Sequence, residues 1–348
     1  MNKLLELFGS YTSTLTLGLG LVSCCISNSL SAQLEPTPVR NEMPLADQQE
    51  IIMMRHAYLD EGSYQYWYEQ SLNGVWPWFE RLGARILGDF EIIYPSSDDA
   101  TPGQDEALRF ARYASYEHWQ ATRSNVSAGN TGGSIRLAGN GGLSDAAVEA
   151  LRNRGQVSQG SRGAIFLQGY LAQTRPLYMP GVVEEFTLVD DNNAPAADSM
   201  SPIPVRLGRA QPGEEILGLE YRRIHKGSFE TFHSITRDRV YPYLEKIGAR
   251  PVGQWQVVYL PNSTAVESAD YDELYTLVRY ASMEHYTQVW TNAVALGGNG
   301  PDYVALLAAF DELNDLSLGA STEFMRGPLY GSLPLYAPGL TETYTLVP

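Results

Sequence analysis

Runs of apolar residues along this chain follow the same order twice. In the first half, strand-like runs rich in β-branched and aromatic residues cover 51–59, 85–94 and 107–114, and a last run covers 182–189. In the second half, the corresponding runs cover 216–224, 250–259, 274–281 and 340–347. Short runs of this composition predict strands that are at least half buried. We therefore expect four strands in each half.

A helix is predicted after the first strand of each half. Its apolar residues recur at helical spacing on one face: Tyr64, Trp67, Val75, Phe79 and Leu82 in the first half, and Phe229, Phe232, Val240, Leu244 and Ile247 in the second. Pro77 and Pro242 interrupt this helix at the same point, which predicts a kink or a change of helical winding. Gly83 and Gly248 are then expected as C-terminal caps.

A second helix is predicted after the third strand. Ser115 and Ser282 are suited to cap its N-terminus, since a serine hydroxyl can accept a hydrogen bond from a free backbone N–H of the first turn. Glu117 and Glu284 follow in that turn, where the helix dipole favours a negative charge. Each half thus has the order β-α-β-β-α-β.

The two halves also share short blocks of similar sequence. "GARILGDFEIIY" (83–94) matches "GARPVGQWQVVY" (248–259) at an offset of 165 residues, and "RYASYEHW" (112–119) matches "RYASMEHY" (279–286). Matches that keep their order along the chain indicate a tandem duplication. The stretch between them, "DDNNAPAADSMSPIP" (190–204), has the composition of a linker. We expect one module at 50–189, a linker at 190–212 and a second module at 213–348.

The predicted fold class is α+β. The order β-α-β-β-α-β is that of the ferredoxin-like unit, in which both helices cover one face of the sheet. The other face is left bare, and a second copy in the same chain can cover it. The sequence therefore predicts two tandem ferredoxin-like modules, packed sheet to sheet as an intramolecular dimeric α/β barrel.

These blocks resemble the NIPSNAP family, within the wider group of dimeric α/β-barrel proteins. The resemblance lies in the aromatic-rich helix with a late proline, then "GAR-x-x-G-x-[FW]", then "RYAS-x-EH", and it covers nearly all of both halves. The arginine that the family tends to carry on its first strand matches Arg55, whereas Glu220 holds that place in the second half. The resemblance implies a fold more firmly than an activity. Other α/β-barrel proteins include cofactor-independent monooxygenases.

The N-terminal residues predict export. An apolar run, "LTLGLGLVSCCI" (15–26), is shorter than the roughly 20 residues that a membrane-spanning helix needs. Two processing routes stay open: ordinary signal cleavage near "NSLSA" (28–32), and lipidation of Cys24 in the lipobox-like "LVSC" (21–24). We expect a signal at 1–32, a polar tether at 33–49, and a periplasmic or extracellular location.

Charge and composition narrow the classes of partner. The formal charge is −16, which disfavours nucleic acid, and membrane contact is expected only through a lipid anchor. Both cysteines, Cys24 and Cys25, lie inside the predicted signal, so the folded body has no thiol. No metal or cofactor motif is present, and we predict none of either. The sequence leaves the oligomeric state open.

Polar residues on the predicted strands are the candidate ligand-binding residues: Arg55, Arg112, Tyr113, Glu220, Arg279 and Tyr280. Strands facing a covered interface should be largely apolar, so these side chains need a role. One interpretation is a ligand cavity between the sheets, in which the arginines bind an anionic group. The other is a salt-bridge network between the two copies that fixes their register.

The five histidines give weak catalytic candidates. His118 and His285 occupy equivalent places, and His56 lies on the first strand; an imidazole at any of them could act as a general base. The alternative places His118 and His285 in exposed first turns of a helix, and His225 and His233 are expected at the surface.

Two functions remain open. One is a non-catalytic small-molecule-binding or scaffold module, with its ligand cavity between the sheets. The other is a cofactor-independent monooxygenase-like or related enzyme, with His56 or a tyrosine as base.

Overall fold

The computed structural model describes residues 43–44, 50–81, 84–94, 100–122, 145–171, 215–327 and 343–344. The predicted signal, including Cys24, and the predicted linker at 190–212 lie outside these residues. So does the strand predicted at 182–189.

Eight antiparallel strands close into a barrel. They are β2 (Ile51–Asp60), β3 (Arg85–Ile93), β4 (Gln104–Tyr113), β6 (Ile165–Leu171), β7 (Ile216–His225), β8 (Arg250–Val258), β9 (Tyr271–Tyr280) and β10 (Ser317–Arg326). Around the barrel the order is β4-β3-β10-β7-β9-β8-β6-β2, and β2 pairs with β4 to close it. A short strand, β5 (Ser158–Ser161), adds to β2. The α+β class and the barrel are therefore confirmed.

Each half supplies four neighbouring strands, and the halves meet at two seams. The first half contributes β6-β2-β4-β3 and the second β10-β7-β9-β8. The seams are the pairs β3–β10 and β6–β8. A closed barrel leaves no unpaired strand edge between the halves. Its interior is filled from both sides by apolar side chains, among them Phe90, Phe110, Leu217 and Trp255.

The fourth strand of each half is not where the sequence predicts it. β6 and β10 take that place in the barrel, well before the apolar runs at 182–189 and 340–347. Of the later run, Thr343–Tyr344 forms β11, which pairs with β1 (Met43–Pro44) outside the barrel. The sequence of β10, "SLGASTEFMR", hides the strand because most of its residues are polar or small, and few of them are buried.

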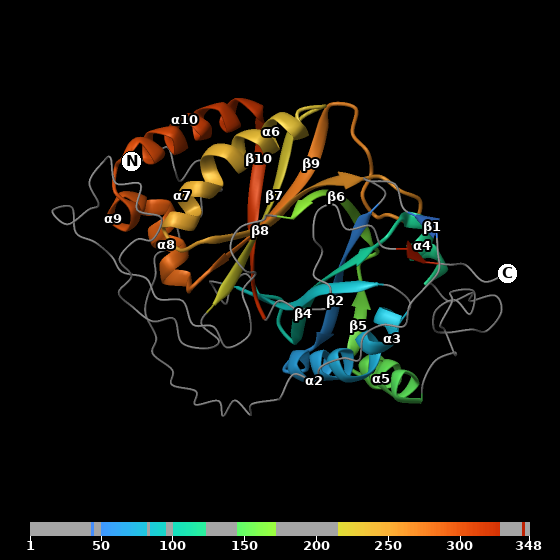
Figure 1. The fold of residues 1–348 in the computed structure, drawn as a ribbon. Helices are drawn as coiled ribbons and strands as arrows, with labels where there is room; N and C mark the ends of the chain where they lie inside the picture. The colour runs from blue at the N-terminus through green and yellow to red at the C-terminus, as the bar shows by residue number, and fades with distance from the viewer. Residues whose placement is uncertain are drawn as a thin grey trace.

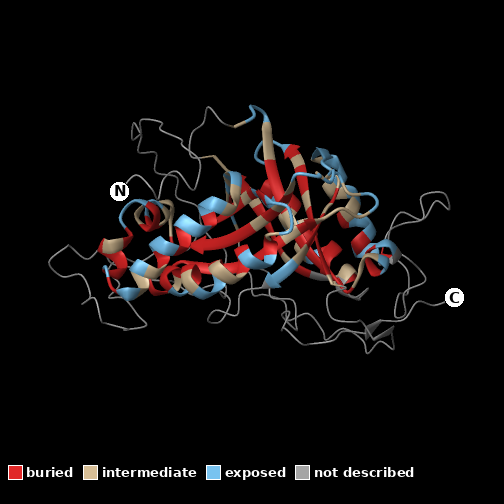
Figure 2. Cartoon of the chain, turned by 90° about the horizontal axis from the view of Figure 1, so that it is seen from above, coloured by how far each residue is buried: buried red, intermediate tan, exposed pale blue. Residues whose placement is uncertain are grey.

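Helices cover the outside of the barrel on two opposite sides (Figure 1). In the first half they are α2 (Tyr64–Gln70), α3 (Trp76–Arg81), α4 (Tyr116–Ala121) and α5 (Asp145–Gln156). In the second half they are α6 (Phe229–Ile235), α7 (Tyr241–Lys246), α8 (Met283–Thr291), α9 (Ala293–Gly297) and α10 (Pro301–Leu316). Figure 2 shows buried strands in the middle and exposed helix faces outside. Within the described residues, no helix is both long and apolar enough to cross a membrane.

The predicted interruption of the first helix is a π-helical turn in both halves. It is η1 (Ser71–Val75) between α2 and α3, and η4 (Thr236–Val240) between α6 and α7. Pro77 and Pro242 follow at the second position of α3 and α7. A proline has no backbone N–H and its ring crowds the carbonyl four residues earlier, so regular α-helical bonding cannot run through it. A local π-helical turn accommodates this.

The predicted caps are confirmed where the structure describes them. The Oγ atoms of Ser115 and Ser282 accept from the backbone N–H groups of His118 and His285. Gly248 ends its helix at φ +90°, a conformation that favours glycine. Gly83 lies outside the described residues.

Candidate functional site

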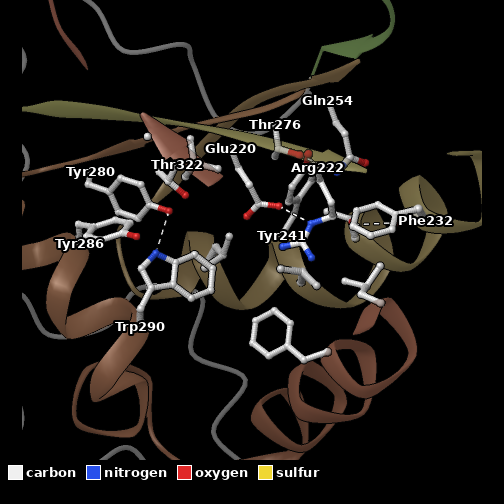
Figure 3. Close-up of a pocket in the computed structure, with 17 residues that line it drawn as sticks. Glu220, Arg222, Phe232, Tyr241, Gln254, Thr276, Tyr280, Tyr286, Trp290 and Thr322 are labelled. Atoms are coloured by element: carbon white, nitrogen blue, oxygen red, sulfur yellow. Dashed lines mark hydrogen bonds and ion pairs between the residues drawn. The ribbon is translucent and has the colours of Figure 1, made fainter. Parts of the chain in front are cut away.

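A cavity of about 50 Å³ lies between the outer face of the second half's strands and the helices that cover them (Figure 3). We call it the helix-side cavity. Its walls come from β7, β8, β9 and β10 on one side and from α6, η4, α7, α8 and α10 on the other. The lining residues are Gly218, Glu220, Arg222, Phe232, Thr236, Val240, Tyr241, Leu244, Gln254, Thr276, Val278, Tyr280, Tyr286, Trp290, Phe310, Leu313 and Thr322.

Strand alternation and the π-helical turn put polar groups into an otherwise apolar wall. Glu220 and Arg222 are two residues apart on β7, so both face outward toward the helices. The turn η4 ends at Val240, and Thr236, Val240 and Tyr241 all line the cavity. π-Helical turns are frequent at functional sites.

Glu220 and Arg222 form a buried ion pair at the centre of the cavity wall. Arg222 Nε donates to Glu220 Oε1 at 2.6 Å, and Arg222 Nη1 donates to Ser317 Oγ at 2.9 Å. The Arg222 guanidinium also lies 5.6 Å from the centre of the Phe232 ring. Burial raises the pKa of Glu220, and the neighbouring Arg222 opposes this shift. The pair leaves little net charge on this wall.

The hydroxyl of Tyr241 is a polar group of this cavity without a hydrogen-bond partner, as is the Oγ1 of Thr322 among the described residues. Tyr241 is 4% exposed and lines the cavity (Figure 3). Among the described residues its oxygen has no hydrogen-bond partner. Burial raises the pKa of this phenol, and the charges of Glu220 and Glu245 add to the shift, so the hydroxyl keeps its proton. It is therefore available to donate a hydrogen bond to a ligand.

Aromatic residues close another part of the cavity. Trp290 Nε1 donates to the Tyr280 hydroxyl at 3.2 Å (Figure 3). Burial, followed by the charge of Glu220, raises the pKa of Tyr286 to about 12. These rings offer flat apolar surface with uncharged polar edges.

Three polar side chains are linked by hydrogen bonds at the strand side of the cavity. His233 Nδ1 lies 2.9 Å from Gln254 Oε1, and Gln254 Nε2 donates to Thr276 Oγ1 at 2.9 Å. His233 is buried, so its expected surface position is wrong. Burial lowers its pKa, which favours the neutral imidazole.

The first half has different residues at the equivalent places. At the 165-residue offset, Arg55 replaces Glu220, Trp76 replaces Tyr241 and Asp89 replaces Gln254. Arg55 Nη2 donates to Ser161 Oγ at 2.8 Å. The combination of Glu220, Arg222 and Tyr241 therefore belongs to the second half.

The structure brings two of the six predicted ligand-binding residues together. Glu220 and Tyr280 both line the helix-side cavity. Tyr113, the equivalent of Tyr280, packs in the core under the helices of the first half. Tyr241 was missed by the sequence analysis, although it immediately precedes Pro242 and so follows the end of the π-helical turn.

Arg112 and Arg279 form ion pairs within their own halves. Arg112 pairs with Glu50, and Arg279 Nη2 lies 3.5 Å from Glu215 Oε1. Glu50 and Glu215 are themselves equivalent at the 165-residue offset. These contacts tie each third strand to the start of its own first strand, whereas the predicted network joined the two copies.

His118 and His285 are buried, so the exposed position considered for them is wrong. They are 1% and 0% exposed. Nδ1 of each accepts the backbone N–H of Ala114 or Ala281 at 3.0 Å. Nε2 of His285 lies 2.7 Å from the carbonyl oxygen of Ile247, to which it donates if Nδ1 accepts. His285 is thus a neutral imidazole that joins a strand end to a helix end.

A second cavity, of about 250 Å³, lies inside the barrel and is lined from both halves. We call it the barrel cavity. The sequence predicted a cavity between the two sheets, and this one has that position. His56 lines it, whereas none of the six predicted ligand-binding residues does: its lining is Met54, His56, Leu108, Arg162, Gly163, Ile165, Leu219, Tyr221, Glu273, Tyr275, Ser321 and Glu323.

Comparisons with known proteins give structural likeness only. No family model and no curated protein matches the chain. A protein from Lactobacillus acidophilus NCFM, provisionally named a monooxygenase, is 8% identical with a TM-score of 0.42, covering 86% of this chain and 97% of that one. A similarly named protein from Fusobacterium nucleatum is 8% identical with a TM-score of 0.40, covering 83% of this chain and 100% of that one. An anthrone oxidase-like protein is 9% identical with a TM-score of 0.38, covering 81% of this chain and 92% of that one. Values this low indicate nothing about activity.

Proposed function

We propose that this protein binds a small uncharged molecule in the helix-side cavity of its second half. The observation that carries the proposal is the Tyr241 hydroxyl, which is buried, lines the cavity and has no hydrogen-bond partner among the described residues. A buried polar group without a partner is costly, so a ligand that accepts its hydrogen bond is stabilised there.

The charge and shape of the cavity support an uncharged ligand. Glu220 and Arg222 already satisfy each other, so a charged ligand would enter without a counter-ion. The remaining wall is mostly aromatic and aliphatic, which favours an apolar body. Because one water-sized group needs about 10–15 Å³, the space suits a molecule, or the end of a molecule, of only a few atoms.

The test is calorimetric titration with short alcohols and phenol, on the full chain and on Tyr241→Phe. Losing one neutral buried hydrogen bond of about 0.5–1.5 kcal/mol should weaken binding roughly two- to tenfold. Tyr66→Phe is the matched control, since Tyr66 is 40% exposed on the other half of the chain. Equal affinities for the two variants and the unchanged protein would reject the site. Native mass spectrometry of protein from its own source would show whether it retains a ligand.

A second candidate function is an enzyme that removes a proton from its substrate, as a cofactor-independent oxygenase does. Glu220 favours it, because burial raises the pKa of this carboxyl group and makes it a stronger base than an exposed glutamate. Glu220, rather than His56, would then be the base. Oxygen uptake with a panel of phenols, lost in Glu220→Gln while binding persists, would support an enzyme; no uptake with any of them leaves binding as the function.

We also propose that each half is a ferredoxin-like module, that the two arose by duplication, and that the chain is a distant NIPSNAP relative. The same strand order in β6-β2-β4-β3 and β10-β7-β9-β8 supports this, as do the two π-helical turns at equivalent places. An experimental structure whose halves do not superimpose strand for strand would contradict it.

Export is proposed from the N-terminal sequence. The mass of the mature N-terminus distinguishes its two forms, because a diacylglycerol on Cys24 adds a large increment and cleavage near 28–32 adds none. Retention of Met1 would reject both.

A further inference from the structure

The barrel cavity is separate from the helix-side cavity and lies on the other face of the strands. On β7, for example, Leu219 and Tyr221 face the barrel, whereas Glu220 and Arg222 face the helices. The two cavities share no lining residue. A ligand in one therefore does not occupy the other.

Each half places a glutamate of its third strand beside a tyrosine at the end of its second strand. In the first half, the Tyr94 hydroxyl donates to Glu106 Oε1 at 2.6 Å. In the second half, the Tyr259 hydroxyl donates to Glu273 Oε2 at 2.9 Å. A duplicated arrangement of acid and phenol, half-buried except for the buried Glu106, makes one end of the barrel interior polar.

The first strand completes each arrangement differently. In the first half, His56 Nε2 lies 2.5 Å from Glu106 Oε2. In the second half, the Tyr221 hydroxyl donates to Glu273 Oε1 at 2.5 Å. Both oxygens of Glu273 thus accept a phenol hydrogen bond, so this carboxylate already has protein partners.

Glu323 is an acid of this cavity that takes no part in the hydrogen bonds of Glu106 and Glu273. It lines the cavity from β10, at the place where the first half has Ile165, and no hydrogen bond or ion pair of its carboxylate is found among the described residues. Arg162, at the same mouth, is the cation that faces it. Among the residues that line the cavity, the carboxylates of Glu273 and Glu323 therefore outnumber the arginine.

Another part of the cavity wall is apolar, and it begins beside Glu323, whose register partner on β7 is Leu219. It consists of Met54, Leu108, Ile165 and Leu219. A ligand that fits both walls has a short hydrocarbon part and a positively charged end. A divalent metal suits the site less, because no group of three or more His, Cys, Asp or Glu residues in the described ranges is placed to hold one.

We propose that the barrel cavity binds a small primary amine in its ammonium form, with its alkyl chain on the apolar wall and its –NH₃⁺ group at Glu323. An ammonium group supplies three donors to a wall rich in acceptors. The alkyl part removes apolar surface from water at about 25 cal/mol per Å². A carboxylate of the same length would meet like charges, and an alcohol would lack the charge-assisted bond.

The test compares butylammonium, butyrate and 1-butanol by calorimetric titration on the full chain at pH 7. We expect the ammonium ion to bind most tightly, and Glu323→Gln to weaken it about tenfold or more, as expected for a hydrogen bond between ions. Glu61→Gln removes an equal charge from an exposed site and should leave binding unchanged. Tyr241→Phe should also leave it unchanged, so failure here and failure of the helix-side site are distinguishable.

A second measurement locates the amine directly. Met54 lines the cavity and is 5% exposed, so its methyl group should show a nuclear Overhauser effect to the alkyl chain in methyl-labelled protein. Binding of butyrate as tight as that of butylammonium, an unchanged affinity in Glu323→Gln, or no contact at Met54 would each overturn the proposal.

Discussion

Asp89 is a fully buried carboxyl group on the outer face of β3. Neither of its oxygens has a hydrogen-bond partner among the described residues. Burial raises its pKa from 3.8 to about 7, although the charges of Arg109 and Arg154 oppose the shift. Its folded-state pKa thus lies above its unfolded value, so its contribution to stability is present below pH 4 and is lost as pH rises through 7.

We therefore expect the free energy of unfolding to fall between about pH 4 and pH 7, and Asp89→Asn to remove much of that slope. A shift of this size corresponds to about 4 kcal/mol at most. Urea unfolding across this pH range measures it. Asp315→Asn, at an exposed position, is the control and should keep the slope. The same slope in both variants would show that other groups cause it.

His285 gives a prediction about structure rather than catalysis. Replacing it with alanine leaves the N–H of Ala281 and the carbonyl of Ile247 without this partner. Unpaired buried groups cost about 1–3 kcal/mol each, so His285→Ala should lower stability by that order. Ligand affinity in either cavity should stay the same once the protein is folded. Lost affinity with unchanged stability would return His285 to the catalytic candidates.

For single residues, the sequence analysis identified several that line a cavity but did not predict what surrounds them. It selected Glu220 and Tyr280, which line one cavity, and His56, which lines the other. It placed His118 and His285 in solvent because the first turn of a helix is commonly polar. Here that turn packs against the strand that precedes it, and the imidazole accepts a hydrogen bond from the first backbone N–H after the strand.

The π-helical turn η1 depends on a close approach between two helices. A Cβ on Gly74 would lie 2.3 Å from the Cβ of Ala150 and 3.0 Å from the carbonyl oxygen of Ala146. Gly74→Ala should therefore destabilise the protein by about 1–3 kcal/mol, as overpacking does.

Gly155→Ala is the matched control for that change. Gly155 lies in α5, where a Cβ would meet nothing within 4 Å, so the substitution should stabilise the protein by about 0.4–1 kcal/mol. Both variants are compared by urea unfolding. Similar effects in the two would mean that helix propensity, and not contact at η1, decides the outcome.

Most strands could be predicted because they are apolar along their length. The first three strands of each half are buried on both faces, by the barrel interior and by the helices, and their predicted starts and ends lie within about three residues of the observed ones. β10 could not, since few of its residues are buried and its place in the barrel comes from pairing with β3 and β7, not from its own composition. The fourth strand of each half was instead assigned to the apolar runs at 182–189 and 340–347, because these are more apolar than β10.

The seam between β6 and β8 makes the two halves one unit. A Cβ on Gly169 would lie 2.4 Å from the carbonyl oxygen of Gln254 across this seam, and Gly169 has φ +157°. We expect Gly169→Ala to cost about 1–3 kcal/mol. The loss should reach both halves, because they share the barrel interior.

Amide hydrogen exchange of Gly169→Ala measures whether both halves lose stability. Protection should fall in β2 and β9, which belong to different halves, by the same amount. Gly103→Ala, at a surface turn with no atom within 4 Å, controls for backbone strain at a positive φ. A loss confined to β6 would show that the halves unfold independently.

Joining both halves in a single polypeptide also removes a constraint that identical subunits impose. In an assembly of two equal chains, any side chain at the His56 place would recur at the Tyr221 place, so the two ends of the pocket would always match. Here the imidazole and the phenol face the same interior as unlike neighbours. A guest molecule with two different ends can therefore be held in one direction only.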